Sequence, residues 1–366
     1  MKAIISGGGS GGHIFPAIAI AGAIKDRWPD ADILFIGAQG RMEMERVPAA
    51  GYPIQALPIE GLKRPLYNPR NIAVAFKMLR SQLMVRRILR SFNPDIVVGV
   101  GGYASAPTLK TAAQMGFRTL LQEQNSYPGL TNKMLAPHAD TICVAYDGLQ
   151  QYFPASKIVL TGNPVRKDIE QLNATPEEAL GHFDLNPAHP VVLSVGGSLG
   201  AGTINRMIQA NLQYFPSNQI QIIWQTGRWD YPAAQEAVRQ AGVEQWVKVH
   251  QFISRMDLAY IAADAVISRA GAIAISELSI VGKPLLLIPS PNVAEDHQTK
   301  NAQALASKGA AILIPDAQCA ADTLPALTSL LADQPRRQAM SQALKTLAMP
   351  GAAARIVDQI ATLTKQ

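Results

Sequence analysis

The segment AIISGGGSGGHIFPAIAIAGAIKDRW, residues 3–28, joins an apolar run, a glycine-rich loop and an amphipathic stretch in that order. The apolar run of residues 3–5 predicts a buried strand, and apolar side chains at helical spacing after the loop predict a helix over residues 14–28. A strand, a tight glycine turn and a helix in this order are typical of a Rossmann-like parallel sheet. We therefore expect an α/β fold at the start of the chain.

The same plan restarts in the second half of the chain. Residues 191–195 (VVLSV) form a nearly uninterrupted apolar run, as expected of a strand buried in a parallel sheet, and lead into the glycine loop 196–202. Apolar runs typical of further strands occupy residues 33–36, 95–99, 265–268 and 285–289. A chain of 366 residues suggests two or three domains. We place a join in a turn-rich stretch and predict domains 1–162 and 163–351, each a Rossmann-like half.

Composition and cysteine content exclude several classes of protein. Hydrophobic residues make up 48% of the chain and charged residues 16%, which excludes a mostly disordered chain. The two cysteines, Cys143 and Cys319, exclude a disulfide framework and a C-x-x-C site, and they fit a reducing compartment. No continuous apolar stretch reaches the ~18–20 residues of a membrane span, and the N-terminus lacks the features of a secretion signal. The sequence therefore predicts a soluble or peripheral protein.

The excess of positive charge lies in the first half of the chain. The net charge is +6; residues 1–162 contain 17 Lys and Arg against 10 Asp and Glu, whereas residues 163–366 contain 16 against 17. A basic half predicts a polyanionic partner: a nucleic acid, a phosphorylated substrate or an anionic membrane.

Residues 61–92 are the most basic segment, with eight Lys and Arg and no Asp or Glu. Apolar residues fall near helical spacing among these cations, namely Ile72, Phe76, Leu79, Leu83, Met84 and Ile88. A basic amphipathic helix is typical of a membrane-surface element, although an ordinary packed helix has the same pattern. Nucleic acid is disfavoured, because the aromatic residues are too scattered for a stacking platform.

The first candidate site is the loop of residues 7–12, in which five of six residues are glycine. Successive glycines let the backbone approach a phosphate, and the helix that follows offers free N–H groups. The loop matches the dinucleotide pattern G-x-G-x-x-G, but the strand 33–36 is followed by Gly37-Ala38-Gln39 rather than by the acidic residue that binds a ribose. This absence disfavours NAD, and a plain tight turn explains so many glycines poorly.

His13 follows this loop at the start of the predicted helix. A helix N-terminus disfavours an imidazolium, so the ring is expected to be neutral and able to accept a proton. A neutral histidine beside an anion-binding loop suits a general base. A histidine that only caps or packs against the helix is an equally good interpretation of this residue alone.

Three further candidate sites lie in the second half. A hydroxyl at Ser198, within the loop 196–200, can donate to a phosphate, although a plain turn also fits. Residues 269–277 read as a small-residue loop that opens a helix; Glu277 there could accept both hydroxyls of a ribose, although a solvated helix charge is the commoner case. The polar residues 295–298 with Asn301 suggest a site at the carboxyl end of a strand. No histidine spacing favours a metal.

Together these motifs resemble the MurG family of UDP-N-acetylglucosamine transferases, which complete the lipid-linked precursor of peptidoglycan. The resemblance spans nearly the whole chain, and the joint order of its motifs is highly specific. It is carried by Gly8-Gly9-Ser10-Gly11-Gly12-His13 with Phe15-Pro16, Gly101-Gly102-Tyr103, Glu123-Gln124-Asn125 with Gly129-Leu130-Thr131-Asn132, Gly162-Asn163-Pro164-Val165-Arg166, Gly196-Gly197-Ser198, Arg269-Ala270-Gly271 through Glu277, and Gln298 with Asn301-Ala302.

The resemblance implies a GT-B fold, with two Rossmann-like domains facing across a cleft, and a C-terminal helix, about residues 352–366, that packs back on the first domain. It also implies which residues bind UDP-N-acetylglucosamine. In the second domain these are Ser198, Ile253, Ala272, Ile273, Ala274, Ile275, Ser276, Glu277 and Gln298, with Glu277 on the ribose. From the first domain they are Ser10, Gly11, Gly12, Asn125 and Arg166.

The activity implied by the resemblance is an inverting transfer of N-acetylglucosamine to the 4-hydroxyl of the muramoyl sugar of lipid I, an undecaprenyl-pyrophosphoryl-muramoylpentapeptide. The products are UDP and lipid II, used in peptidoglycan synthesis and hence in cell shape and cell division. His13 is the candidate catalytic base, and no metal or other cofactor is expected. The segment 61–92 would hold the protein peripherally on the anionic cytoplasmic face of the cell membrane, with no nucleic acid as partner.

Three alternatives belong to other classes or substrates. A related UDP-sugar transferase could act on another lipid acceptor. An NAD-dependent oxidoreductase is disfavoured by the missing acidic residue after Ile36. A nucleotide-sugar sensor or membrane scaffold without catalysis would bind the sugar nucleotide but show no turnover.

Overall fold

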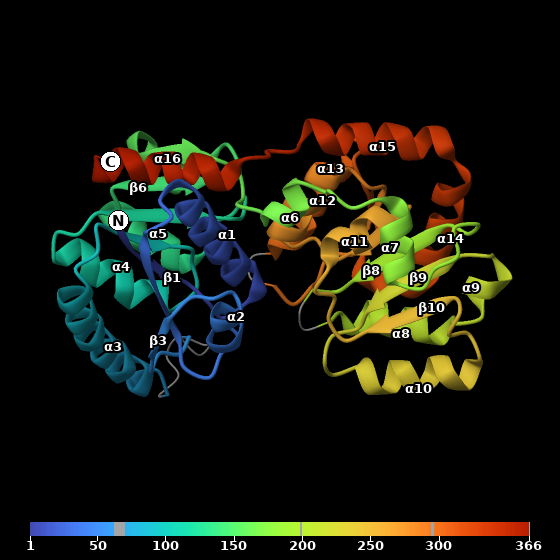
Figure 1. Cartoon of the computed structure of the whole chain (residues 1–366), viewed down its shortest axis with the longest axis horizontal. Coiled ribbons are helices and arrows are strands. Elements are labelled where there is room, and N and C mark those ends of the chain that lie inside the picture. Colours follow the sequence, from blue (N-terminus) through green and yellow to red (C-terminus); the bar gives the residue numbers. More distant parts are fainter. Residues whose placement is uncertain (62–69, 198–199, 294–295, 366) are drawn as a thin grey trace. The chain divides into compact units, whose positions relative to one another are not determined.

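The computed structural model describes residues 1–61, 70–197, 200–293 and 296–365. The chain divides into two compact units (Figure 1): Met1–Arg166 with Met349–Gln366, and Lys167–Ala348. The first unit thus takes in the C-terminal segment. The join that we propose from the sequence, at 162/163, lies four residues before this division.

The first unit is built on a seven-stranded sheet in which every pair of neighbouring strands is parallel. Its order is β3-β2-β1-β4-β5-β6-β7. The strands are β1 (Lys2–Ser6), β2 (Asp32–Ala38), β3 (Ile54–Leu57), β4 (Ile96–Gly99), β5 (Thr119–Glu123), β6 (Thr141–Val144) and β7 (Ile158–Leu160).

Helices cover both faces of this sheet (Figure 1), because neighbouring residues of each strand point to opposite sides. Ile5 joins one buried cluster with residues of α1 and α16, whereas Ile4 joins a second cluster with residues of α3, α4 and α5. The helices of the unit are α1 (Gly11–Arg27), α2 (Glu43–Ala49), α3 (Arg70–Phe92), α4 (Ser105–Gln114), α5 (Leu130–Leu135) and α16 (Ala352–Thr364).

The second unit has a six-stranded parallel sheet of order β10-β9-β8-β11-β12-β13. Its strands are β8 (Val191–Val195), β9 (Gln221–Gln225), β10 (Val247–His250), β11 (Ala265–Ser268), β12 (Leu285–Leu287) and β13 (Ile312–Leu313). Its helices are α6 (Lys167–Glu170), α7 (Pro176–His182), α8 (Gly202–Ala210), α9 (Tyr214–Ser217), α10 (Tyr231–Ala241), α11 (Met256–Ala262), α12 (Ala272–Val281), α13 (His297–Ala306), α14 (Cys319–Ala332) and α15 (Gln334–Thr346).

The strand order reverses once in each sheet. The chain adds strands to one side of β1 or β8 and then returns to the other side with β4 or β11. In such sheets the loops at the carboxyl ends of these two strands diverge and leave a crevice that binds ligands. The prediction of two Rossmann-like α/β halves is confirmed, and each half has its own candidate crevice.

Candidate active site

In the first unit, the loops after β1 and β4 approach each other as closely as backbone allows. A Cβ atom on Gly102 would lie 2.2 Å from the carbonyl oxygen of Gly8, and Gly102 has a φ of +78°. Only glycine combines this conformation with this contact. The absence of a side chain at Gly102 therefore allows the two loops to pack together at the crevice.

A buried carboxylate from α2 fixes the same loop. Glu43 accepts hydrogen bonds from the backbone N–H groups of Gly9 (3.0 Å) and Ala38 (3.0 Å). A Cβ on Gly8 would lie 2.1 Å from Glu43 Oε1. The N–H of Gly9 is therefore engaged within the protein, and the predicted phosphate contacts of this loop rest on its other amides. Sequence reasoning missed Glu43, because its partner in the glycine loop, Gly9, lies 34 positions away.

His13 is the third residue of α1 and directly follows the glycine-rich loop, after Ser10, Gly11 and Gly12. The imidazole Nδ1 lies 3.1 Å from Ser10 Oγ. At the opposite side of the ring, a Cβ on Gly101 would lie 2.9 Å from Nε2. Gly101 has a φ of +91°, so the conformation that favours glycine also leaves space for the ring.

The carboxyl end of β5 supplies a second buried carboxylate, Glu123. It accepts hydrogen bonds from the backbone N–H (2.9 Å) and the side-chain amide (3.1 Å) of Asn125. It also accepts from the N–H of Gly129 (3.1 Å) and from Nδ2 of Asn132 (2.9 Å). Burial raises the pKa of Glu123 above its ordinary value. The hydrogen bonds from these donors favour the charged form and offset only part of that rise. Glu123 thereby shapes the loop that carries Asn125.

Arg166 reaches the same edge of the first unit. Asn163 ties its segment to β5: the Asn163 amide donates to the carbonyl of Gln124 (3.0 Å) and accepts from Gln122 (3.2 Å). The Arg166 guanidinium lies 5.7 Å from the ring centroid of Phe15, on α1. Arg166, Asn125 and His13 thus come from three separate segments that follow strands at the carboxyl edge of one sheet.

In the second unit, Gln225 joins two segments of the predicted donor site. The side chain is buried at the end of β9, donates to the carbonyl of Gly197 (3.1 Å) and accepts from the N–H of Ile253 (2.9 Å). Both ends of one amide therefore hold the glycine loop and the Ile253 segment together. Ser198, predicted to donate to a phosphate, lies outside the described residues.

Helix α12 begins at the carboxyl end of β11, after Gly271, and carries the largest group of predicted residues. These are Ala272, Ile273, Ala274, Ile275, Ser276 and Glu277. Ile273 and Ile275 are buried, so their side chains serve the core. Glu277 is half-buried and accepts a hydrogen bond from the hydroxyl of buried Tyr260 (3.2 Å). One carboxylate oxygen is thus oriented from α11.

Gln298 is the second residue of α13, at the carboxyl edge of the second sheet. Its Oε1 accepts from the backbone N–H of Ser290 (2.8 Å), which links α13 to the segment directly after β12. Asn301 donates to the carbonyl of Ala270 (3.3 Å) and so links α13 to the start of α12. Glu295, part of the same predicted motif, lies outside the described residues.

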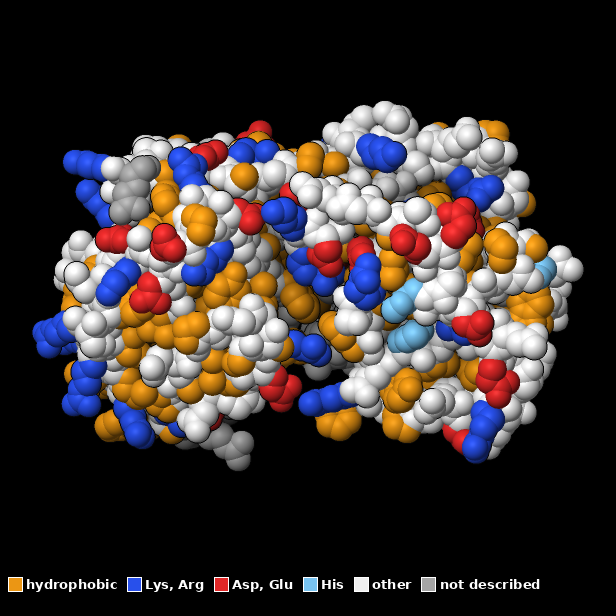
Figure 2. Space-filling view, viewed as in Figure 1, with side chains coloured by type: hydrophobic (Ala, Val, Ile, Leu, Met, Phe, Trp, Pro, Cys, Tyr) orange, Lys and Arg blue, Asp and Glu red, His pale blue; other side chains and the backbone are white. Residues whose placement is uncertain are grey.

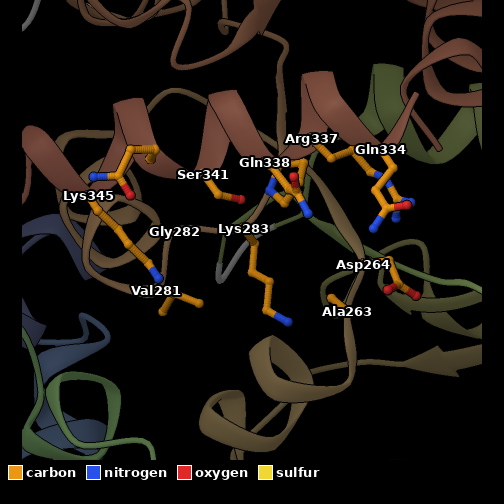
Figure 3. A pocket seen from close by; sticks show the side chains of 12 residues that line it. Ala263, Asp264, Val281, Gly282, Lys283, Gln334, Arg337, Gln338, Ser341 and Lys345 are labelled. Atoms are coloured by element: carbon orange, nitrogen blue, oxygen red, sulfur yellow. The ribbon is translucent and has the colours of Figure 1, made fainter. Parts of the chain in front are cut away.

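A separate pocket of about 520 Å³ lies at the other edge of this sheet, before β11 and β12. Figure 3 shows side chains of α15, among them Arg337 and Lys345, beside Lys283 and Asp264. Lys283 donates to the carbonyl of Ile261 (3.2 Å), and burial lowers its pKa. None of the residues predicted to bind substrate lines this pocket.

Among the residues that the structure describes, no three His, Cys, Asp or Glu side chains gather as a metal site would require. Within the same part of the chain, no helix has the length and hydropathy needed to cross a bilayer.

Known proteins place the chain among glycosyltransferases. The model of the glycosyltransferase family 28 N-terminal domain matches residues 3–144, and that of the family 28 C-terminal domain matches residues 191–356. A curated relative from Parabacteroides distasonis is 53% identical over 98% of this chain and 97% of its own length. A second, from Bacteroides fragilis, is 51% identical over 100% of this chain and 96% of its own.

Both relatives are named UDP-N-acetylglucosamine--N-acetylmuramyl-(pentapeptide) pyrophosphoryl-undecaprenol N-acetylglucosamine transferase. The crystal structure of Acinetobacter baumannii MurG matches with a TM-score of 0.74 at 28% identity, over 99% of each chain. The resemblance inferred from the sequence motifs is confirmed. The chain therefore belongs to glycosyltransferase family 28 and, within it, to the MurG transferases, whose GT-B fold of two Rossmann-like domains it shares.

Proposed function

We propose that this chain transfers N-acetylglucosamine from UDP-N-acetylglucosamine to the 4-hydroxyl of the muramoyl sugar of lipid I, with inversion, and releases UDP. The observation that carries the proposal is identity above one half, over nearly the full length, to transferases named for this donor and acceptor. A candidate crevice at the strand-order reversal of each sheet supports it, because both an acceptor and a sugar nucleotide need a site.

The donor would bind at the carboxyl edge of the second sheet. Glu277 has one oxygen oriented by Tyr260 and is suited to accept from ribose hydroxyls. The N-terminus of α12, after Gly271, is suited to the pyrophosphate, because its free N–H groups favour anions. From the first unit, the backbone of the loop Ser10, Gly11 and Gly12, with the side chains of Asn125 and Arg166, would complete donor binding when the sugar nucleotide is bound.

His13 would act as the general base. It takes the proton of the acceptor hydroxyl while the oxygen attacks the anomeric carbon and the bond to UDP breaks. The leaving UDP gains negative charge, and backbone N–H groups and the Arg166 guanidinium are suited to stabilise it. We propose that no resident metal takes part.

The acceptor carries a long lipid, and α3 offers a surface suited to a membrane. Four large apolar side chains are exposed on it at spacings of four, three and four residues: Ile72 (66%), Phe76 (70%), Leu79 (60%) and Leu83 (59%). At 3.6 residues per turn these side chains form one stripe. The opposite face of α3 is buried through Val74, Ser81, Val85 and Leu89. The stripe is therefore not needed to fold the unit.

Cations border this stripe. Arg80, Arg86, Arg87 and Arg90 are exposed on the same helix, and Figure 2 shows Lys and Arg side chains gathered at the lower left, where Figure 1 places α3. Apolar side chains ringed by cations favour an anionic bilayer surface. We propose peripheral binding of α3 to the cytoplasmic face of the cell membrane. Residues 62–69 of the predicted basic segment lie outside the described residues.

The test is release of UDP from UDP-N-acetylglucosamine, with and without a short-chain lipid I analogue. We expect release that requires the analogue, together with a new disaccharide product. If the sugar nucleotide binds but no sugar moves to lipid I, the proposed acceptor is wrong, and transfer to another lipid acceptor would then be the alternative. If nothing is transferred to any lipid, the chain is a sensor rather than an enzyme.

A further inference from the structure

Ser10 occupies the N-cap position of α1, yet its hydroxyl does not cap the helix. Its backbone is extended, with φ −152° and ψ 158°, as is usual for an N-cap residue. Serine at this position ordinarily accepts a hydrogen bond from the N–H two or three residues later. No such side-chain bond is present, and the backbone carbonyl of Ser10 accepts from His13 and Ile14 instead. The hydroxyl is directed to another partner.

That partner is the imidazole of His13, whose Nδ1 lies 3.1 Å from Ser10 Oγ. A neutral histidine carries one N–H, and the bond made by one ring nitrogen decides which nitrogen keeps a lone pair. If Nδ1–H donates to Ser10 Oγ, the lone pair is on Nε2. When Nε2 then takes a proton, Nδ1–H still has its acceptor, so the hydroxyl also stabilises the imidazolium that the reaction forms.

We propose that Ser10 is a positioning residue for the catalytic base: its hydroxyl accepts from Nδ1–H of His13 and holds the lone pair of Nε2 for the acceptor hydroxyl. This inference rests on the proposed function. In the transfer, the acceptor O–H bond breaks and its proton passes to Nε2. The oxygen bonds to the anomeric carbon, and the bonding electrons of the anomeric C–O bond leave with UDP.

The opposite edge of the ring supports this assignment. The ideal Cβ position of Gly101 is 2.8 Å from Cδ2 and 2.9 Å from Nε2 of His13. The ring thus lies between the hydroxyl of Ser10 and a glycine whose missing side chain leaves room beside Nε2. Rotation of the ring by half a turn would exchange Nδ1 with Cδ2 and break the bond to Ser10. The contact with Ser10 therefore favours one orientation of the ring.

The test compares Ser10→Ala with Ser10→Thr, which keeps a hydroxyl. Nitrogen NMR of protein labelled with ¹⁵N-histidine reports the tautomer of each ring, and His13→Gln assigns the His13 signal. We expect wild type and Ser10→Thr to carry the His13 proton mainly on Nδ1, and Ser10→Ala to shift it toward Nε2. With the short-chain lipid I analogue, kcat of Ser10→Ala should fall roughly tenfold with little change in KM for UDP-N-acetylglucosamine. Ser10→Thr should restore kcat.

Different outcomes separate this proposal from its rivals. If Ser10→Ala raises KM for UDP-N-acetylglucosamine and leaves the tautomer unchanged, Ser10 binds the donor, and the positioning role is overturned. If the wild type transfers no sugar to lipid I, the proposed function fails, whereas the tautomer measurement still decides the Ser10–His13 contact. Because Ser10 makes no side-chain cap bond, Ser10→Ala should unfold at the wild-type temperature; a large drop would mean that lost activity reflects misfolding, and the tautomer in the folded fraction would decide.

Discussion

Gln225 and Tyr260 are two buried residues whose polar groups bond to segments of the candidate donor site. Gln225 uses both ends of its amide, on Gly197 and Ile253, and Tyr260 uses its hydroxyl on Glu277. A carboxylate that must meet two ribose hydroxyls gains from being held in one orientation, because less freedom is lost when the ligand binds. The affinity of the site should therefore depend on residues that do not touch the nucleotide.

We predict that Tyr260→Phe weakens UDP binding by roughly fivefold, the effect of losing one hydrogen bond worth about 1 kcal/mol. Isothermal titration calorimetry with UDP measures this change. Tyr214→Phe is the matched control, because Tyr214 donates to the carbonyl of Leu324 (3.2 Å) away from the predicted donor residues. Equal losses in the two variants, or no loss in Tyr260→Phe, would contradict the orienting role.

The site residues that the sequence predicts are marked by a local pattern, whereas the buried residues that hold them in place are not. Runs of glycine are a local signal, because they reveal where backbone must approach a ligand or another loop. Glu43 and Glu123 are single carboxylates whose importance comes from burial and from the amide donors that surround them. The Gly9–Glu43 bond spans 34 positions, and no pattern around Glu43 marks it as the partner of the glycine loop. Positions in the fold, not residue type, make these side chains part of the site.

Helix α3 combines two apolar stripes of different purpose. The buried stripe through Val85 and Leu89 packs in the core of the first unit, and the exposed stripe faces away from it. Helix α5 exposes Leu130 (63%) and Met134 (65%), and both α3 and α5 pack against α4. The membrane-facing surface that we propose could therefore extend from α3 to α5.

We predict that Phe76→Glu lowers binding to vesicles of phosphatidylglycerol and phosphatidylcholine at least tenfold. The change removes an apolar side chain that would be buried in the bilayer, and it adds a charge that anionic lipid repels. Trp229→Glu is the control, because Trp229 is equally exposed (71%) but lies on the second unit. Co-sedimentation with the vesicles is the measurement, and added salt should weaken wild-type binding. If both variants bind equally well, α3 is not the docking helix.

At the scale of elements, apolar runs predicted β1, β2, β4, β8, β11 and β12. The strands β5 and β9 are also buried throughout, but polar residues at their ends interrupt the apolar signal, and sequence reasoning missed them. β1, β8 and β11 fall where uninterrupted aliphatic residues predicted them. β3 and β7 lie at the edges of the first sheet and are only partly buried, so their sequences carry weaker apolar signals. Helix α1 begins at Gly11, three residues before the expected start, because the helix includes glycines that propensity alone disfavours.

The two ends of the chain meet in the core of the first unit. Ile356, Val357 and Ile360 of α16 join the buried cluster that contains Ile20 and Ile24 of α1. The guanidinium of Arg355 donates to the carbonyl of Thr161 at 3.0 and 2.7 Å, which fastens the start of α16 beside the end of the first chain segment. The family resemblance implies a C-terminal helix, about residues 352–366, that packs back on the first domain, and in the structure the apolar face of α16 lies in this cluster. The first unit is thus completed by the last residues of the chain.

Because each unit has its own core, we predict that a cavity in one weakens that unit first. Ile360→Ala should cost the first unit about 2–5 kcal/mol, since it removes a fully buried side chain. Leu327→Ala makes the corresponding cavity in the second unit, where Leu327 is also fully buried. Native-state hydrogen exchange read by mass spectrometry assigns the faster exchange to peptides of one unit or the other. UDP at about 100 times its Kd should raise the free energy of unfolding of the second unit by about 2.7 kcal/mol. Exchange in that unit should therefore slow, which reverses part of the Leu327→Ala effect. Exchange that accelerates equally in both units for either variant would mean that the two cores unfold as one.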